Sequence, residues 1–333
     1  MSDTAVNAEL RPPTAPARHR EPAPVHPRAD RGTVIALEVG ATYIKGYALG
    51  PDGVLRDGER WFTRPERGPD AVLETVLTCA ATLAERCRPT AAGVILPGTV
   101  DDTSGRAVRA GALGWREVPV RDWVAEHLEL PVAVGHDGRA GGLAEARAGA
   151  GRGCRDFLFV SVGDGIAAAV VRAGRAASRV PHAAGELGHT VVRPGGDPCH
   201  CGARGCLETV ASAAAVTRRY ARATGRRGVG VREVYHRAGA GERAALAVCG
   251  QAADALAEVL ATAIGRYAPE RVVIAGELVD AGAARLTALR EALTGRLGAP
   301  AVPELRVARF GATAGCMGAA LLARDLARAH ADR

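Results

Sequence analysis

A histidine and three cysteines lie close together in a glycine-rich stretch, residues 185–208, which reads GELGHTVVRPGGDPCHCGARGCLE. Thiolate and neutral imidazole are preferred zinc ligands, and His189, Cys199, Cys201 and Cys206 complete a tetrahedral shell without water. Cys199 and Cys201 are too close in sequence for an easy mutual disulfide, and three thiols cannot all pair among themselves. The stretch therefore predicts a structural Zn²⁺ site. The alternative is a glycine-rich loop that holds ordinary buried thiols.

The motif ELGH, followed ten residues after its histidine by CHCGARGCLE, resembles the ROK family of sugar kinases, sugar-responsive repressors and related open reading frames. The resemblance implies that the histidine and three cysteines hold zinc. It also implies that the loop presents Glu186, His189 and Glu208 to the hydroxyls of a hexose. Carboxylates accept hydrogen bonds from vicinal hydroxyls, and a zinc-bound histidine can turn its other ring nitrogen to a polar partner.

Composition places the chain among globular proteins. It has 333 residues, of which 47% are hydrophobic, and no apolar run approaches the length of a membrane span. The N-terminus lacks the apolar segment of a secretory signal, so we expect a cytoplasmic protein. We expect reduced core thiols at the remaining cysteines, which are Cys79, Cys87, Cys154, Cys249 and Cys316.

The net charge of +7 does not indicate a nucleic-acid-binding protein. The cations are almost all arginine, with Lys45 the only lysine, and they are spread along the chain rather than gathered with a recognition motif. Residues 1–30 are rich in proline and poor in apolar residues, which predicts a disordered tail. Repressors of the resembled family carry a helical DNA-binding domain at this place, and such a tail cannot form one. We therefore expect no specific nucleic-acid binding.

From residue 33 onward the pattern alternates between strands and helices. The expected strands are 33–40, 43–50, 92–98, 271–279 and 305–310, with a hairpin over 157–175. The expected helices are 69–88, 119–129, 210–223, 242–268, 283–297 and 313–330, with a glycine- and alanine-rich helix following a strand within 130–153. Small residues at 311–320 suit close packing of the last helix on a sheet.

The turn between the first two strands reads EVGATY where the resembled family has DxGGTK. The resemblance implies that Glu38 replaces the aspartate that helps hold Mg²⁺, and that Gly40 and Thr42 lie near the phosphates of ATP. Tyr43 stands where a lysine is usual. Lys45 lies on the same face of the strand and partly compensates. Without the family, the segment is a plain β-hairpin.

A second phosphate loop is implied at Gly163, Asp164 and Gly165, where the family has a threonine in place of Asp164. A carboxylate about 4 Å from a phosphate costs about 4 kcal/mol at an effective dielectric of about 20, unless Mg²⁺ bridges the two groups. The family's glycine triplet near the adenine and ribose appears here as Ala-Gly-Glu, with Gly276 followed by Glu277.

The expected catalytic base is Asp137, which follows a strand in the sequence GHDGRAG where the family has ENDANAA. The resemblance implies that it takes the proton of the C6 hydroxyl. His136 replaces an asparagine and introduces a group that titrates at about pH 6.5. The resemblance also implies that Gly98 lets the backbone approach a sugar hydroxyl, and that Ala112 stands where the family has a sugar-binding asparagine. Read without the family, an aspartate after a strand is most often a helix N-cap.

The resemblance covers residues 33–330 and implies an α/β chain with the actin-like ATPase (ribonuclease H-like) fold, two α/β domains around a cleft. We expect a small domain at 31–134, completed by the helix at 313–330, and a large domain at 135–312. The predicted function is an ATP-dependent kinase for glucose or a related sugar such as kanosamine or an N-acetylhexosamine, with a homodimer or homotetramer implied by the family. The alternative is a sugar-binding sensor with little or no kinase activity.

Overall fold

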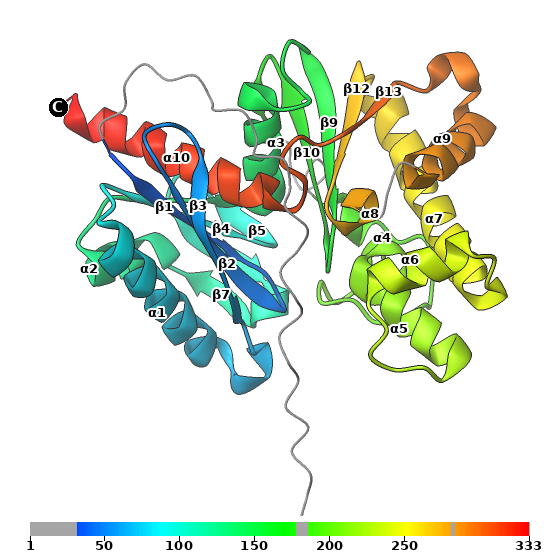
Figure 1. Cartoon of the computed structure of the whole chain (residues 1–333), viewed down its shortest axis with the longest axis horizontal. Coiled ribbons are helices and arrows are strands. Elements are labelled where there is room, and N and C mark those ends of the chain that lie inside the picture. The colour runs from blue at the N-terminus through cyan, green and yellow to red at the C-terminus, as the bar shows by residue number, and fades with distance from the viewer. Residues whose placement is uncertain (1–31, 178–185, 281–283, 333) are drawn as a thin grey trace, which may run out of the picture.

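The computed structural model describes residues 32–177, 186–280 and 284–332. The tail predicted at 1–30 lies outside these residues, as does Gly185. Two five-stranded sheets lie on either side of two central helices, and further helices cover the outer face of each sheet (Figure 1).

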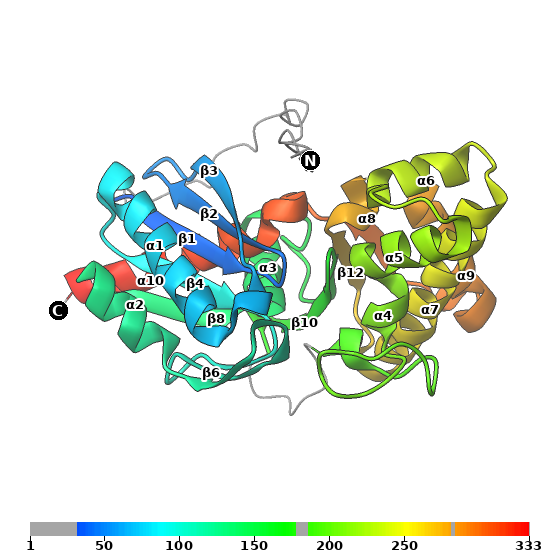
Figure 2. The ribbon, with the colours of Figure 1, turned by 90° about the horizontal axis from the view of Figure 1, so that it is seen from below.

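The first sheet has the strand order β3-β2-β1-β4-β8. Its strands are β1 (Val34–Val39), β2 (Tyr43–Leu49), β3 (Leu55–Phe62), β4 (Ala92–Leu96) and β8 (Val132–His136). The antiparallel pairing of β1 with β2 confirms the predicted hairpin and places Glu38 opposite Lys45. Helices α1 (Pro69–Cys87) and α2 (Val120–Leu128) pack their apolar sides on one face of this sheet (Figure 2).

The second sheet has the order β11-β10-β9-β12-β13. Its strands are β9 (Asp156–Val162), β10 (Ile166–Arg172), β11 (Arg175–Ala176), β12 (Arg271–Ala275) and β13 (Glu304–Val307). Successive side chains of β9 point to opposite faces of the sheet, so they belong to two separate hydrophobic cores. Phe157 and Phe159 face the central helices, and Leu158 and Val160 face the outer ones.

The outer helices of the second sheet follow the cysteine-rich loop along the chain. They are α4 (Leu207–Ala211), α5 (Ala213–Thr224), α6 (Val231–Gly239), α7 (Arg243–Tyr267), α8 (Glu277–Asp280) and α9 (Ala284–Leu297). Among the described residues, α7 alone is long and apolar enough to pass a length-and-composition test for a membrane span. Half of its most apolar window is buried, and Leu256 and Leu260 belong to the core. These are the properties of a core helix.

The two central helices are α3 (Asp137–Ala148) and α10 (Ala314–Ala331). They contact each other, and α10 also packs on β1, β4 and β8. A Cβ on Gly318 would lie 2.0 Å from the carbonyl oxygen of Ala140, and one on Gly93 would lie 2.0 Å from that of Ala319. The small residues at 311–320 therefore permit close helix packing, as expected.

A small sheet with the order β5-β6-β7 extends the first layer. It consists of β5 (Thr99–Asp101), β6 (Arg106–Ala110) and β7 (Trp115–Val118). Single 3₁₀ turns complete the chain at η1 (Pro65–Arg67), η2 (Gly111–Leu113), η3 (Leu187–His189), η4 (Ala299–Ala301) and η5 (Gly311–Thr313).

Three expected elements differ from the structure. The strand predicted at 305–310 is found as β13, which ends at Val307, so residues 308–310 lie outside it. The strand predicted at 271–279 ends at Ala275, because Gly276 turns the chain with φ of 86° and the next residues form α8. The helix predicted at 210–223 is interrupted at Ser212, whose extended backbone ends α4 and whose hydroxyl accepts the N–H of Ala215 to cap α5. The expected domain boundary at 134/135 falls inside β8, and the two-domain division stays a prediction.

Candidate functional site

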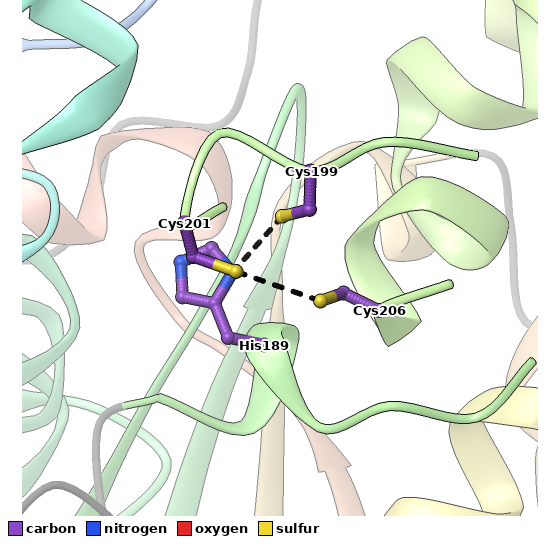
Figure 3. Close-up of side chains that lie close together, drawn as sticks. All are labelled: His189, Cys199, Cys201 and Cys206. Atoms are coloured by element: carbon purple, nitrogen blue, oxygen red, sulfur yellow. Dashed lines mark hydrogen bonds between the residues drawn. The ribbon is translucent and has the colours of Figure 1, made fainter. Parts of the chain in front are cut away.

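His189, Cys199, Cys201 and Cys206 converge on one point, with their ligand atoms all within 4.8 Å of one another (Figure 3). Nδ1 of His189 lies 3.3 Å from Sγ of Cys199, and Sγ of Cys201 lies 3.6 Å from Sγ of Cys206. Two sulfurs on a tetrahedral zinc, each at about 2.3 Å, stand about 3.8 Å apart. The donor set and its spacing therefore suit a four-coordinate Zn²⁺, and none of these thiols is in a disulfide.

Glycine gives this loop its shape. Gly205 has φ of 75°, and a Cβ there would lie 1.6 Å from the carbonyl oxygen of Arg193. Its own carbonyl accepts the N–H groups of Val192 and Arg193, and a β-bridge between Val191 and Cys206 closes the loop. Only glycine adopts this backbone at so close an approach without strain.

The remaining nitrogen of His189 points toward a carboxylate. Its Nε2 lies 3.6 Å from Oε2 of Glu186, so Nδ1 is free to meet the metal while Nε2–H faces an acceptor. Glu208, at the start of α4, accepts the backbone N–H of Ile166 with Oε2 at 2.9 Å. Glu208 therefore ties the cysteine-rich loop to β10 through one of its two carboxylate oxygens.

Asp137 and His136 stand where β8 ends and α3 begins. His136 is buried and caps α3, because its Nδ1 accepts the N–H groups of Gly138 at 3.1 Å and Arg139 at 3.4 Å. Asp137 is the first residue of the helix rather than its cap, and its side chain is 26% exposed. Its Oδ1 accepts the N–H of Gly138 at 2.6 Å. The residue that caps α3 is therefore His136 and not Asp137, for which the N-cap alternative was considered.

The surroundings of Asp137 and His136 shift the pKa values of both side chains. Burial raises the pKa of Asp137 to about 7, with Glu38 acting in the same direction, and the Gly138 N–H, Arg139 and Lys45 opposing. Burial lowers the pKa of His136 to about 4. The expectation of a group that charges at about pH 6.5 is therefore wrong: His136 is neutral at pH 7, because its ring is enclosed and used as a cap.

Glu38 lies in a small polar cluster between β1, β2 and α10. Its Oε1 pairs with Nζ of Lys45 at 3.2 Å, and its Oε2 accepts from Sγ of Cys316 at 3.2 Å. Lys45 also donates to the carbonyl oxygen of Ala312 at 3.3 Å. The carboxylate of Glu38 raises the pKa of Lys45, which keeps the ammonium charged. The charges of Glu38 and Lys45 also act on the pKa of Asp137, which Glu38 raises and Lys45 lowers.

The first predicted phosphate loop is the turn between β1 and β2. The N–H of Gly40 donates to the carbonyl oxygen of Tyr43, whereas its carbonyl accepts the hydroxyl of Thr63 at 2.7 Å. Thr42 is exposed at the tip of the turn. The turn is thus held by its own backbone and by Thr63, and its outermost side chain is open to solvent.

The second predicted loop is the turn between β9 and β10. The N–H of Gly163 donates to the carbonyl oxygen of Gly165, and Asp164 is exposed between them. A Cβ on Gly165 would lie 2.7 Å from Oε2 of Glu208, and one on Gly276 would lie 2.4 Å from the carbonyl oxygen of Val162. The structure therefore gathers this turn, Glu208 and Gly276 at one end of the second sheet.

Gly98 turns the chain between β4 and β5 with φ of 82°, and a Cβ there would lie 2.3 Å from the carbonyl oxygen of Arg109. Arg109 in turn donates to the carbonyl oxygen of Cys201 at 3.0 Å. The turn that contains Ala112 also meets the cysteine-rich loop, because a Cβ on Gly111 would lie 2.4 Å from the carbonyl oxygen of His200. The small sheet is therefore in contact with the loop.

Four residues near these positions were missed by the predicted site. Lys45 was predicted only to compensate for Tyr43. The predicted hairpin places it opposite Glu38, which is a sequence signal for their ion pair. Arg139 pairs with the carboxylate of Asp102 through two nitrogens at 3.2 and 2.6 Å. Cys316 and Arg109 gave no sequence signal, because their partners come from distant parts of the chain.

Comparison with known proteins identifies the family of this chain. The chain matches the ROK family over residues 34–326. A glucokinase of Halalkalibacterium halodurans is 32% identical over 253 residues, which are 70% of this chain and 76% of that protein. The N-acetylglucosamine repressor of Escherichia coli O157:H7 is 29% identical over 248 residues, which are 71% of this chain and 61% of the repressor.

A solved structure extends the likeness to the fold. The ROK family glucokinase of Streptomyces griseus, in complex with glucose and AMPPNP, superposes with a TM-score of 0.79 at 26% identity. The likeness covers 88% of this chain and 100% of that one. The chain therefore has the actin-like ATPase fold predicted for it. Since the family match spans nearly all the described residues, the chain belongs to the ROK family.

Proposed function

We propose that the protein is an ATP-dependent hexose kinase that phosphorylates the C6 hydroxyl of glucose or a related sugar. The observation that carries this proposal is Asp137, a carboxyl at the end of β8 whose pKa is raised to about 7. A base works best when its pKa is near the working pH. The similarity to glucokinases supports the same reaction class.

In the proposed reaction Asp137 accepts the proton of the C6 hydroxyl as that oxygen attacks the γ-phosphorus of ATP. The bond between the γ-phosphorus and the β,γ-bridging oxygen breaks, ADP leaves, and the proton passes from Asp137 to solvent. In phosphoryl transfer the protein mainly positions the reactants and stabilises charge. A well-placed general base raises the rate by about 10²- to 10⁴-fold.

The sugar-holding residues in this proposal are Gly98, His136, Glu186, His189 and Glu208. Glu186 immediately precedes the turn η3 and His189 ends it, and both side chains are part-exposed. Glu208 has one oxygen engaged by Ile166, which leaves the other for a hydroxyl. Compared with the family, this chain lacks the amide side chain at Ala112 and has a neutral imidazole at His136. These are the two positions that would distinguish an amino sugar from glucose.

ATP is proposed to lie between the turn at Gly40 and Thr42 and the turn at Gly163, Asp164 and Gly165, with Gly276 near its nucleoside. Glu38 and Asp164 are the carboxylates that would hold Mg²⁺, which neutralises phosphate charge when bound. Asp164 is open to solvent, so its carboxylate is available to a cation without rearrangement of the core.

We further propose a structural Zn²⁺ at His189, Cys199, Cys201 and Cys206. The donor set completes a tetrahedron, which leaves no position for a reacting water. Its task is to brace the loop that carries Glu186 and His189. The short distances among the four donor atoms support this proposal, and disulfide chemistry does not account for the converging histidine.

A second candidate function is a sugar-binding sensor with little kinase activity. One observation favours it: Glu38 is already paired with Lys45, and Cys316 also contacts it, so the carboxylate is less available to Mg²⁺. Asp164 replaces a neutral threonine of the family and repels a phosphate that arrives without a cation.

A sugar panel with Mg-ATP separates these functions. Purified protein is assayed for ADP release with glucose, mannose, N-acetylglucosamine, N-acetylmannosamine and kanosamine. The kinase proposal expects turnover with at least one sugar and a loss of about 100-fold or more in the Asp137→Asn variant, because the base is gone.

The matched control is Asp122→Asn. Asp122 also lies in the first turn of a helix, α2, but is exposed. It should keep wild-type turnover. A hexose that raises the melting temperature without any ADP release from the wild-type protein would contradict the kinase proposal and support the sensor.

A further inference from the structure

Two segments of the proposed site leave neighbouring strands of the first sheet. β4 and β8 are parallel partners, and Leu96 at the end of β4 lies beside His136 at the end of β8. From these ends the chain continues through the turn at Gly98 into β5, and through Asp137 into α3. A contact that fixes one segment to the other therefore fixes Gly98 and Asp137 relative to each other.

Arg139, in the first turn of α3, makes such a contact. Its Nε donates to Oδ2 of Asp102 at 3.2 Å and its Nη2 to Oδ1 at 2.6 Å, which is a two-point ion pair. Nη2 also donates to the carbonyl oxygen of Val100 in β5 at 3.1 Å. The Arg139 side chain is 19% exposed. One guanidinium therefore holds a side chain and the backbone of the β5 segment.

The segment around Asp102 is also fixed to other elements. Arg121 of α2 donates to the carbonyl oxygen of Asp102 at 2.6 Å and to that of Thr103 at 2.7 Å. β5 itself pairs with β6. The pair of Arg139 and Asp102 therefore joins two ordered pieces of chain, unlike an ion pair between mobile surface side chains.

The place of Arg139 is unfavourable for α3 taken alone. The N-terminal end of a helix carries partial positive charge, so a cation in its first turn is destabilising. His136 already caps this helix, and the arginine adds no cap. The carboxylate of Asp102 compensates the cation from another element. The contact with the β5 segment, rather than helix stability, therefore accounts for an arginine at this place.

We propose that Arg139 and Asp102 are positioning residues that hold the turn at Gly98 against the start of α3, and so align the sugar with Asp137. This role rests on the proposed function, because it takes Gly98 as a sugar contact and Asp137 as the base. A sugar that is held less firmly and less well aligned with its base binds more weakly and reacts more slowly.

Arg139 also acts on Asp137 through its charge. Burial raises the pKa of Asp137, and so does Glu38 of β1, whereas the Gly138 N–H, Arg139 and Lys45 of β2 lower it. Two substitutions separate the charge from the contact. Arg139→Met removes both, whereas Arg139→Lys keeps the charge but cannot make the two-point contact.

The contact is tested first without turnover, by hydrogen–deuterium exchange of the backbone at 97–105 in the whole protein. We expect Arg139→Met and Asp102→Asn each to speed exchange about threefold to tenfold. The double variant should be no faster than the faster single variant, because the same pair is lost. Arg147→Met is the matched control, since Arg147 lies on α3 and makes a two-point pair with Asp325 of α10 instead. Wild-type exchange in both single variants overturns the inference.

The effect on the site is tested with the panel sugar that the wild-type protein phosphorylates fastest. We expect Arg139→Met to weaken sugar binding about threefold to tenfold by calorimetry and to lower kcat by a similar factor. It should also raise the midpoint of the pH–rate profile by about half a pH unit, because a cation near the base is lost. Arg139→Lys should show the same losses in binding and kcat but keep the wild-type midpoint.

Two results would overturn the positioning role. A pair that only stabilises the fold predicts a lower melting temperature in Arg139→Met with wild-type sugar affinity and kcat. A pair that acts only through charge predicts that Arg139→Lys has wild-type affinity and kcat.

Failure of this role and failure of the proposed function are distinguishable. If the wild-type protein phosphorylates no sugar of the panel, or Asp137→Asn is as active as the wild-type protein, the proposed function has failed and this role fails with it. If Asp137→Asn is inactive but Arg139→Met keeps the wild-type affinity and kcat, only the inference about Arg139 and Asp102 has failed.

Discussion

At the scale of single residues, Asp137 as the proposed base should set how activity depends on pH. Burial raises its pKa to about 7, and a general base acts only when it is ionised. Below that pH the acid form predominates, so turnover should fall about tenfold for each further pH unit, and above it turnover should level off. Initial rates at saturating sugar and Mg-ATP check this. A rate that stays flat well into the acid range would contradict the assignment.

Lys45 is a second residue with a measurable effect on that profile. Its ammonium lowers the pKa of Asp137, whereas Glu38 raises it. Lys45→Met should therefore shift the rising limb of the pH–rate profile upward, by about half a unit at an effective dielectric of about 20. Arg60→Met is the control, because Arg60 lies opposite Lys45 on β3 and stacks on Tyr43 instead. If the rising limb of the pH–rate profile is unshifted in Lys45→Met, Lys45 does not act on Asp137.

At the scale of elements, the cysteine-rich loop should depend on its metal. Cys201→Ser removes one of four converging donors, so we expect less than one zinc per chain by elemental analysis and a melting temperature lower by about 5 °C or more. Cys87→Ser, on the C-terminal turn of α1 and outside the cluster, should keep both values. Wild-type protein without zinc, or equal zinc in both variants, would contradict the proposed site.

Local sequence information was enough for most elements and for part of the site. The first hairpin and the convergence of His189 with the three cysteines were predictable because their residues are close in sequence. The break at Ser212 was not, because an alanine-rich stretch favours helix throughout and only the backbone of one residue departs from it. The lowered pKa of His136 could not be predicted from the sequence either, because it depends on the burial of the ring rather than on residue type.

At the scale of the whole molecule, long-range contacts join the small sheet to the cysteine-rich loop. Arg109 meets the carbonyl of Cys201 across 92 residues, and Cys316 meets Glu38 across 278. Such contacts depend on how the layers pack, and no periodicity in the sequence predicts them. They are the part of the site that only the structure supplies.

The contact of Arg109 should help the proposed sugar site keep its shape. We expect Arg109→Ala to weaken sugar binding about threefold to tenfold, the equivalent of about one hydrogen bond, with a smaller change in kcat. Calorimetry with the preferred sugar measures this. Arg116→Ala is the matched control, because Arg116 is exposed on β7 directly opposite Arg109. Equal affinities in both variants would contradict a role for the contact.

The central claim is that Asp137 removes the proton of a sugar hydroxyl during phosphoryl transfer. The most direct measurement is mass spectrometry of the sugar after incubation with Mg-ATP and either wild-type protein or Asp137→Asn. The claim predicts a hexose 6-phosphate from the wild-type protein and about 100-fold less or none from the variant. Equal amounts of product from the two proteins, or no phosphorylated sugar from the wild-type protein with any member of the panel, would contradict it.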